Sequence, residues 1–259
     1  KEFCLQKSIN FTEEIPATSL IAQLRPDVII VASFGKIIPK IIIDFPKYGS
    51  LNIHPSLLPK YRGPSPVITS LLNGDKVTGV SIISLDSGID SGPLILQKKY
   101  TIPQNNDTQL LTQNLFTEGT KLILSLLAKP SEIFNSFPQD ESKASMTKKI
   151  LKKDGHINWS NPAQTILNQI RAIGHNPGTY SYLEGKKIKI HNADLYNHDI
   201  DGLSDGEIYS IKEDGFHLLL VKASDHIVNL LLVQPENRSK MTPQAYLSGY
   251  SNNIGKKLD

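Results

Sequence analysis

The run at residues 26–34, PDVIIVASF, restricts the fold of this chain more than any other feature. It is continuous, apolar and rich in β-branched residues, which predicts a strand covered on both faces, as in a parallel sheet. Further short apolar runs predict three more strands, at 50–54, 77–85 and 93–102.

Helical patterns separate and follow these runs. One segment, 64–75, reaches a stop signal at Gly74, and a long amphipathic segment, 105–130, offers Asn105 or Asn106 as an N-cap. Strands that alternate with helices predict an α/β domain over this first half.

The composition changes after residue 130. Residues 131–153 are polar and lysine-rich, which predicts a linker, and 158–174 predicts a helix with Asn161 as N-cap and Pro162 as its first residue. Short alternating runs follow, with turn signals at Glu184-Gly185 and Asp214-Gly215. We therefore expect a second, mostly β domain, a small OB-like barrel. The predicted boundaries are a catalytic domain at 1–133, a linker at 134–152 and a β-barrel domain at 153–259.

The bulk composition excludes several classes of protein. Of the 259 residues, 39% are hydrophobic and 20% charged, as in a globular protein with a buried core. The net charge of +3 permits a nucleic-acid partner but does not argue for one. The single cysteine, Cys4, cannot form an internal disulfide, so we expect a cytoplasmic protein. No apolar run approaches the ~18 residues of a membrane span.

Two polar residues stand at the end of the predicted strand 50–54. Side chains at i and i+2 point to the same face of a strand, so Asn52 and His54 lie together, opposite Leu51 and Ile53. Ligands of open α/β sheets gather at the carboxyl ends of the strands. An amide donor and an imidazole there suit the stabilisation of a developing oxyanion and the movement of a proton. Alternatively, the pair only ties down a loop.

Two acidic residues lie in the glycine-rich turn SLDSGIDSGPL. Asp86 and Asp90 follow the predicted strand 77–85, beside glycines that allow close approach of the backbone to a ligand. An Asp near His54 would orient the imidazole and favour its protonated form. The alternative is that both residues are ordinary turn formers.

These stretches together resemble the folate-dependent formyltransferases. NIHPSLLPKYRGPSP and, later, TGVSIISLDSGIDSGPLI match that family's motifs in order. The resemblance implies a catalytic triad of Asn52, His54 and Asp90, and a Rossmann-like, mostly parallel sheet whose first strands are missing from this chain. It also implies a folate site lined by Ser56, Leu57, Leu58, Pro59, Phe34, Gly35 and Asp86.

The second half is similar to the C-terminal domain of the family members that act on methionyl-tRNA. INWSNPAQTILNQIRAIGHNPGTYSYLEGKKIKI and LLLVQPENRSKMTPQAYLSGY carry this similarity. It implies formyl transfer from 10-formyltetrahydrofolate to the α-amino group of initiator methionyl-tRNA, without a metal and without a membrane, by a monomer. Asn52 and protonated His54 would donate to the formyl oxygen, while Asp90 would help to remove the amine proton.

A tRNA substrate must be held through its phosphates. Lysines of the linker and of the second domain are candidates, although any one of them could simply be solvated: Lys148, Lys149, Lys152, Lys153, Lys186, Lys187 and Lys189. Three other functions stay open. They are formyl transfer to an amino-sugar nucleotide or within a larger folate dehydrogenase, the single-domain purine-pathway reaction, against which the region after Asn158 argues, and an RNA-binding remnant without activity.

Overall fold

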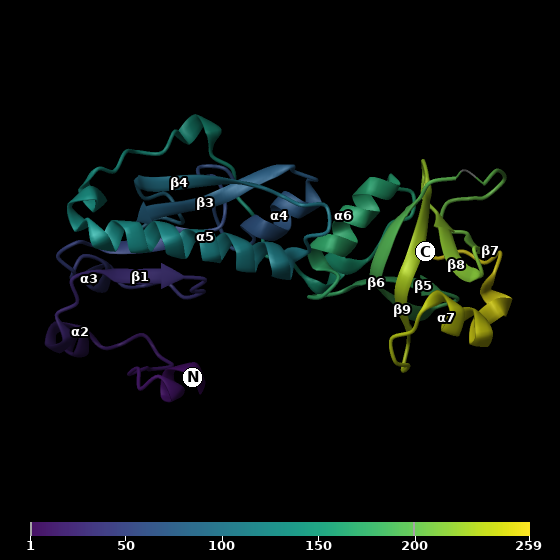
Figure 1. The fold of residues 1–259 in the computed structure, drawn as a ribbon, viewed down its shortest axis with the longest axis horizontal. Coiled ribbons are helices and arrows are strands. Elements are labelled where there is room, and N and C mark those ends of the chain that lie inside the picture. Colours follow the sequence, from purple (N-terminus) through teal and green to yellow (C-terminus); the bar gives the residue numbers. More distant parts are fainter. Residues whose placement is uncertain (1, 199) are drawn as a thin grey trace. The chain divides into compact units, whose positions relative to one another are not determined.

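The computed structural model describes residues 2–198 and 200–259. Residues 1 and 199, which the predicted domains 1–133 and 153–259 include, lie outside the described residues. The chain divides into two compact units, each built from several segments (Figure 1). Unit 1 comprises Lys1–Pro64, Gly79–Tyr100 and Asn114–Met146, and unit 2 comprises Ser65–Thr78, Thr101–Gln113 and Thr147–Asp259. The domain boundaries expected from the sequence stay predictions.

A four-stranded mixed sheet forms the centre of unit 1. The strands are β1 (Ile29–Ala32), β2 (Ser50–His54), β3 (Val77–Ser84) and β4 (Leu94–Thr101), in the order β1-β2-β3-β4. β1 pairs with β2 in parallel, whereas β2 and β3 are antiparallel. The expected α/β class is confirmed. β1 is shorter than predicted and is not covered on both faces, because its residues alternate and Ile30 is 40% exposed.

Helix α5 (Thr108–Ala128) covers one face of this sheet with its later turns. Ile123 and Leu126 pack with Leu51 and Ile53 of β2 in one buried cluster. Gly119 permits this close approach, because a Cβ there would lie 2.4 Å from Ile53 Cγ2. The predicted caps were wrong: the Asp107 carboxylate accepts from Leu110 N at 2.8 Å, because Asp107 directly precedes the helix.

The remaining helices of the described residues are shorter than α5. They are α1 (Glu2–Gln6), α2 (Thr18–Leu24), α3 (Lys40–Ile43), α4 (Pro66–Leu72), α6 (Ala163–Ile173), α7 (Pro243–Tyr250) and the 3₁₀ turns η1 (Pro130–Phe134), η2 (Glu141–Lys143), η3 (Lys152–Gly155) and η4 (Ser251–Asn253). α6 begins one residue later than predicted. Its N-cap is Pro162 rather than Asn161, and the acceptor for Ala163 N is the distant Asp225 carboxylate, at 2.7 Å.

The predicted second domain is an antiparallel sheet within unit 2. Its strands are β5 (Thr179–Leu183), β6 (Lys186–Tyr196), β7 (Ile208–Glu213), β8 (Phe216–Lys222) and β9 (Ile227–Pro235), in the order β5-β6-β9-β8-β7. Both predicted turns are present: Glu184-Gly185 and Asp214-Gly215 have positive φ at each residue. The C-terminal segment 255–259 bonds to both edge strands, through Ile208 N to Lys256 O and Asp259 N to Tyr182 O. The sheet is therefore barrel-like.

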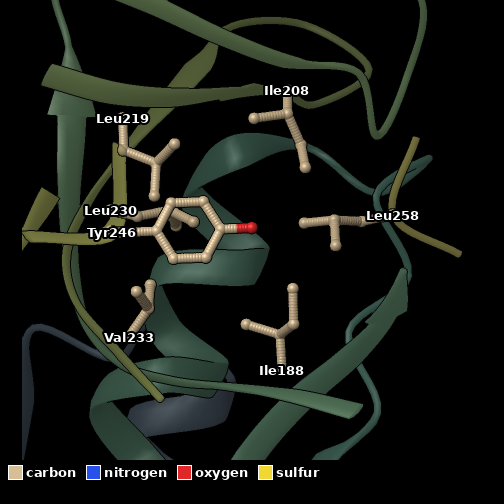
Figure 2. A pocket seen from close by; sticks show the side chains of 7 residues that line it. All are labelled: Ile188, Ile208, Leu219, Leu230, Val233, Tyr246 and Leu258. Carbon is tan, nitrogen blue, oxygen red and sulfur yellow. The ribbon is translucent and has the colours of Figure 1, made fainter. Parts of the chain in front are cut away.

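A small void in the core of this barrel is lined by apolar side chains and the Tyr246 side chain. Figure 2 shows the Tyr246 ring of α7 surrounded by aliphatic side chains from the strands and by Leu258 of the C-terminal segment, with a residual void of only about 10 Å³. The Tyr246 hydroxyl accepts from Asn253 Nδ2 at 2.9 Å, so the buried oxygen is paired. None of the helices in the two described stretches has the length and apolar character needed to cross a bilayer.

Candidate active site

Strand β2 presents two polar side chains on one face, as its sequence predicts. Leu51 and Ile53 are buried against α5, which places Asn52 and His54 on the opposite face. β1 runs parallel to β2, with Ala32 opposite Ile53, so the carboxyl ends of both strands meet at the same edge of the sheet. Asn52 and His54 lie at this edge, where open α/β sheets bind ligands.

A single carboxylate joins these two side chains. Asp90 Oδ1 accepts from Asn52 Nδ2 at 3.2 Å, and Asp90 Oδ2 lies 3.4 Å from His54 Nδ1. Oδ2 also accepts from the backbone N–H of Gly63 at 2.8 Å. The structure thus brings together the three residues, from β2 and from the β3–β4 loop, that the sequence singled out.

The imidazole of His54 has a defined orientation. Its ring is buried, and Nε2 donates to the Tyr61 carbonyl at 2.9 Å. A carbonyl can only accept, so the neutral ring carries its proton on Nε2 and turns Nδ1 towards Asp90. Burial lowers the pKa of His54 below its ordinary 6.5, and Asp90 and the Tyr61 carbonyl oppose this shift without reversing it. Asp90 therefore favours the protonated form, as expected, whereas burial favours the neutral one.

This arrangement can polarise a carbonyl and accept a proton beside it. The Asn52 amide has two N–H bonds, of which one is directed at Asp90, and the side chain is only half-buried. The second N–H is thus available to an acceptor on a ligand. His54 Nδ1 supplies a neutral base within reach of the same carboxylate.

The loop after β2 is fixed by side chains of β3 and β4. Ser81 Oγ donates to Ser56 O at 2.6 Å, and Gln97 Nε2 donates to Leu58 O at 2.9 Å. Ser56 and Leu58 are buried, whereas Leu57 and Pro59 are half-exposed. Of the four residues expected to line a folate site here, Leu57 and Pro59 offer side-chain surface, and the other two anchor the loop.

The other three residues expected at a folate site are exposed. Phe34 and Gly35 follow the carboxyl end of β1, at the same edge of the sheet as His54, and Phe34 is 48% exposed. The Asp86 carboxylate accepts from Gly88 N at 2.9 Å and from Ser91 Oγ at 3.1 Å. Asp86 thus caps the turn, as its sequence context allows, while its role at a folate site stays a prediction.

Sequence reasoning missed a group of residues that contacts the Asp90 turn. Gln139, in the segment predicted as a linker, donates from Nε2 to the carbonyl oxygens of Asp90 and Gly92, at 2.8 and 2.7 Å. Gln139 in turn accepts from the buried guanidinium of Arg62. The Tyr61 carbonyl and the Gly63 N–H are backbone groups, so the sequence does not indicate that they contact His54 and Asp90. The one sequence feature that points to these contacts is Arg62, a charged residue directly after Tyr61.

The lysines predicted to contact tRNA all lie in unit 2. Lys148, Lys149, Lys152 and Lys153 are exposed. Lys186 and Lys187 line a pocket of about 600 Å³, together with Arg238 and Lys256. Lys187 Nζ lies 4.0 Å from the ring centre of Tyr180, and Lys189 is opposite Tyr180 in the sheet, so this outer face combines cations with aromatic rings.

Within the described residues, no group of three or more His, Cys, Asp or Glu side chains is arranged to hold a metal ion.

Known proteins share both halves of this chain. The formyl transferase family model matches residues 5–127, and the model of the formyl transferase C-terminal domain matches residues 149–251. A methionyl-tRNA formyltransferase of Caldicellulosiruptor saccharolyticus is 35% identical over 96% of this chain and 81% of its own length. The corresponding enzyme of Dictyoglomus thermophilum is 37% identical over 100% of this chain and 85% of its own length.

The fold has solved counterparts as well. HypX from Aquifex aeolicus, in complex with tetrahydrofolic acid, superposes with a TM-score of 0.68 at 18% identity, over 92% of this chain and 41% of that protein. At this identity the likeness shows the fold alone. The two family models and the identity to full-length relatives go further: the chain belongs to the formyl transferase family, alongside the methionyl-tRNA formyltransferases.

Proposed function

We propose that this protein transfers the formyl group of 10-formyltetrahydrofolate to the α-amino group of methionine on initiator tRNA. The observation that carries the proposal is the Asp90 carboxylate, which holds the Asn52 amide and the His54 ring around one point at the edge of the sheet. Relatives that align with almost the whole chain are methionyl-tRNA formyltransferases, which supports the same substrate.

Asn52 and His54 would act on the formyl carbonyl. Bound 10-formyltetrahydrofolate supplies the formyl group, and attack by the neutral amine places negative charge on the formyl oxygen. The free N–H of Asn52 would donate to that oxygen as the charge develops. A preorganised donor of this kind stabilises the transition state more than the ground state, because the charge is small before the attack.

His54 would take up the proton that the attacking amine must lose. Its neutral Nδ1 is the acceptor, directly or through water, because Nε2–H is engaged by Tyr61. The imidazolium that forms faces Asp90 Oδ2, which stabilises it. The proton is finally delivered to the departing folate nitrogen as the new C–N bond to methionine replaces the old one.

The surface beside Asn52, His54 and Asp90 suits the binding of a folate. A pterin is flat and needs apolar walls with backbone hydrogen bonds. Leu57, Pro59 and Phe34 offer apolar surface, and the backbone of Gly35 and of the turn from Asp86 to Asp90 offers polar groups. Ser56 and Leu58 would shape the site by holding the loop that carries Leu57 and Pro59.

The tRNA would be bound largely by unit 2. The pocket with Lys186, Lys187, Arg238 and Lys256 suits phosphate groups, and the Tyr180–Lys187 face suits an unpaired base. Lys189 and the exposed lysines at 148, 149, 152 and 153 would add phosphate contacts. We further propose a cytoplasmic monomer, with domain boundaries at residues 133 and 153.

The function is tested by incubating the purified protein with 10-formyltetrahydrofolate and either methionyl-tRNA or an amino-sugar nucleotide. We expect formyl-methionyl-tRNA and no formylated sugar. Formylation of the sugar alone would replace the proposed substrate. Absence of both products, with no binding of the folate, would support an inactive RNA-binding remnant instead.

A further inference from the structure

Gln139 connects the Asp90 turn to a buried guanidinium. Its Nε2 donates to two carbonyl oxygens of the turn, Asp90 O at 2.8 Å and Gly92 O at 2.7 Å. Its Oε1 accepts from Arg62, from Nε at 3.0 Å and from Nη2 at 2.9 Å. Gln139 is 8% exposed, so each of these bonds is shielded from water.

Arg62 is itself fixed at both ends. Its guanidinium, in a residue only 6% exposed, binds Glu141 through Nη1 at 2.9 Å and Nη2 at 2.6 Å. Its backbone N–H donates to Ser145 O at 2.8 Å. The guanidinium, fixed by its two bonds to Glu141, can only donate. The Gln139 amide therefore has one orientation, with Oε1 towards Arg62 and Nε2 towards the turn.

The Asp90 turn needs such support. Asp90 has a φ of +51°, a left-handed conformation that costs a residue with a Cβ and persists only where its surroundings hold it. On the side of β3 the turn is closely packed, since a Cβ at Gly92 would lie 1.8 Å from Ser84 O. On the other side the two bonds from Gln139 hold the carbonyls on both sides of Ser91.

We infer that Gln139, oriented by Arg62, is a positioning residue that holds the Asp90 carboxylate against Asn52 and His54. Its hydrogen bonds within the described part of the chain go to Arg62 and to the carbonyl oxygens of Asp90 and Gly92, so it acts on the site through the backbone of the turn. The consequence for activity depends on the proposed formyl transfer, whereas the consequence for the geometry of Asp90 and His54 does not.

Two variants test the inference. Gln139→Leu removes the donors and the acceptor in a side chain of similar size. Gln139→Glu keeps the acceptor for Arg62 but loses both donors to the turn, so it preserves the buried partner of the guanidinium if the first variant fails to fold. Asn135→Asp, at an exposed position of the same segment, is the matched control for the amide-to-carboxylate change.

The first readout is independent of activity. Among the described residues, the charged group in contact with the His54 ring is Asp90, and the Arg62 guanidinium interacts electrostatically with Asp90 as well as with Glu141 and Asp86. Displacing Asp90 removes its support for the protonated ring, so NMR titration of ¹³C-labelled histidine should show the His54 pKa lower by about one unit in Gln139→Leu. An unchanged His54 pKa in a folded variant would overturn the inference.

The second readout is kinetic. Both Gln139 variants should lose about 10- to 100-fold in kcat per folded molecule, with KM for methionyl-tRNA within about threefold, since only the alignment of the reacting groups changes. Asn135→Asp should match wild type. A merely structural Gln139 would lower the melting temperature but leave kcat unchanged, which would overturn the inference. If wild type forms no formyl-methionyl-tRNA, the proposed function fails, while the titration still decides the role of Gln139.

Discussion

Replacing Asn52 with alanine tests the proposed oxyanion contact with little effect on the fold. The substitution removes the amide that bonds Asp90 Oδ1 at 3.2 Å, an interaction worth about 1 kcal/mol of stability. The backbone pairing of β2 with β1 and β3 does not involve this side chain. We therefore expect the variant to fold, with a free energy of unfolding lower by about 1 kcal/mol in urea titrations.

The effect on catalysis should be much larger than the effect on stability. Loss of one preorganised donor to a developing oxyanion costs about 10²–10³ in rate. At 1.36 kcal/mol for each factor of ten, this corresponds to about 2.7–4 kcal/mol of transition-state stabilisation. Single-turnover formylation of methionyl-tRNA with saturating folate measures it directly, and Asn135→Ala serves as the exposed control. A loss below about tenfold in folded Asn52→Ala would refute the assignment of Asn52 as a donor.

Three further predictions concern His54 and the lysines of unit 2. His54→Ala should abolish formyl transfer while circular dichroism shows an intact fold, and near-wild-type turnover would contradict the mechanism. Because burial lowers the pKa of His54, the unfolded chain binds a proton more readily as the pH falls below 6.5. The stability advantage of wild type over His54→Ala, measured by urea unfolding, should therefore be largest above pH 6.5 and shrink below it; a constant difference would contradict a neutral buried ring. Lys186→Glu with Lys187→Glu should weaken tRNA binding and reduce the slope of log K against log salt by about one to two, and an unchanged slope would remove both lysines from the interface.

The sequence predicts the parts of this fold that depend on local pattern. Alternation along 50–54 correctly separates Leu51 and Ile53 from Asn52 and His54, and the dipeptides Glu184-Gly185 and Asp214-Gly215 locate two hairpins. Family resemblance, rather than periodicity, links Asp90 to His54 across the chain. The structure places the two side chains in contact, with His54 Nδ1 3.4 Å from Asp90 Oδ2.

What the sequence misses depends on contacts between distant segments. Apolar runs do not reveal strand direction, so the antiparallel pairing of β2 with β3 has no local signal. The acceptor for the first turn of α6 is Asp225, far along the chain, whereas the local sequence predicts Asn161. Gln139 lies in a polar segment without periodicity, and its importance emerges only from its four bonds to Arg62, Asp90 and Gly92.

The central claim is that Asn52, His54 and Asp90 act as one unit on one carbonyl group. A double-mutant cycle of Asn52→Ala and Asp90→Ala, measured by single-turnover formylation of methionyl-tRNA, tests this claim most directly. If the shared carboxylate holds the amide in place, the double variant should lose little more activity than the more damaging single variant. Losses that multiply in full would mean that the two residues act independently, and would contradict the account.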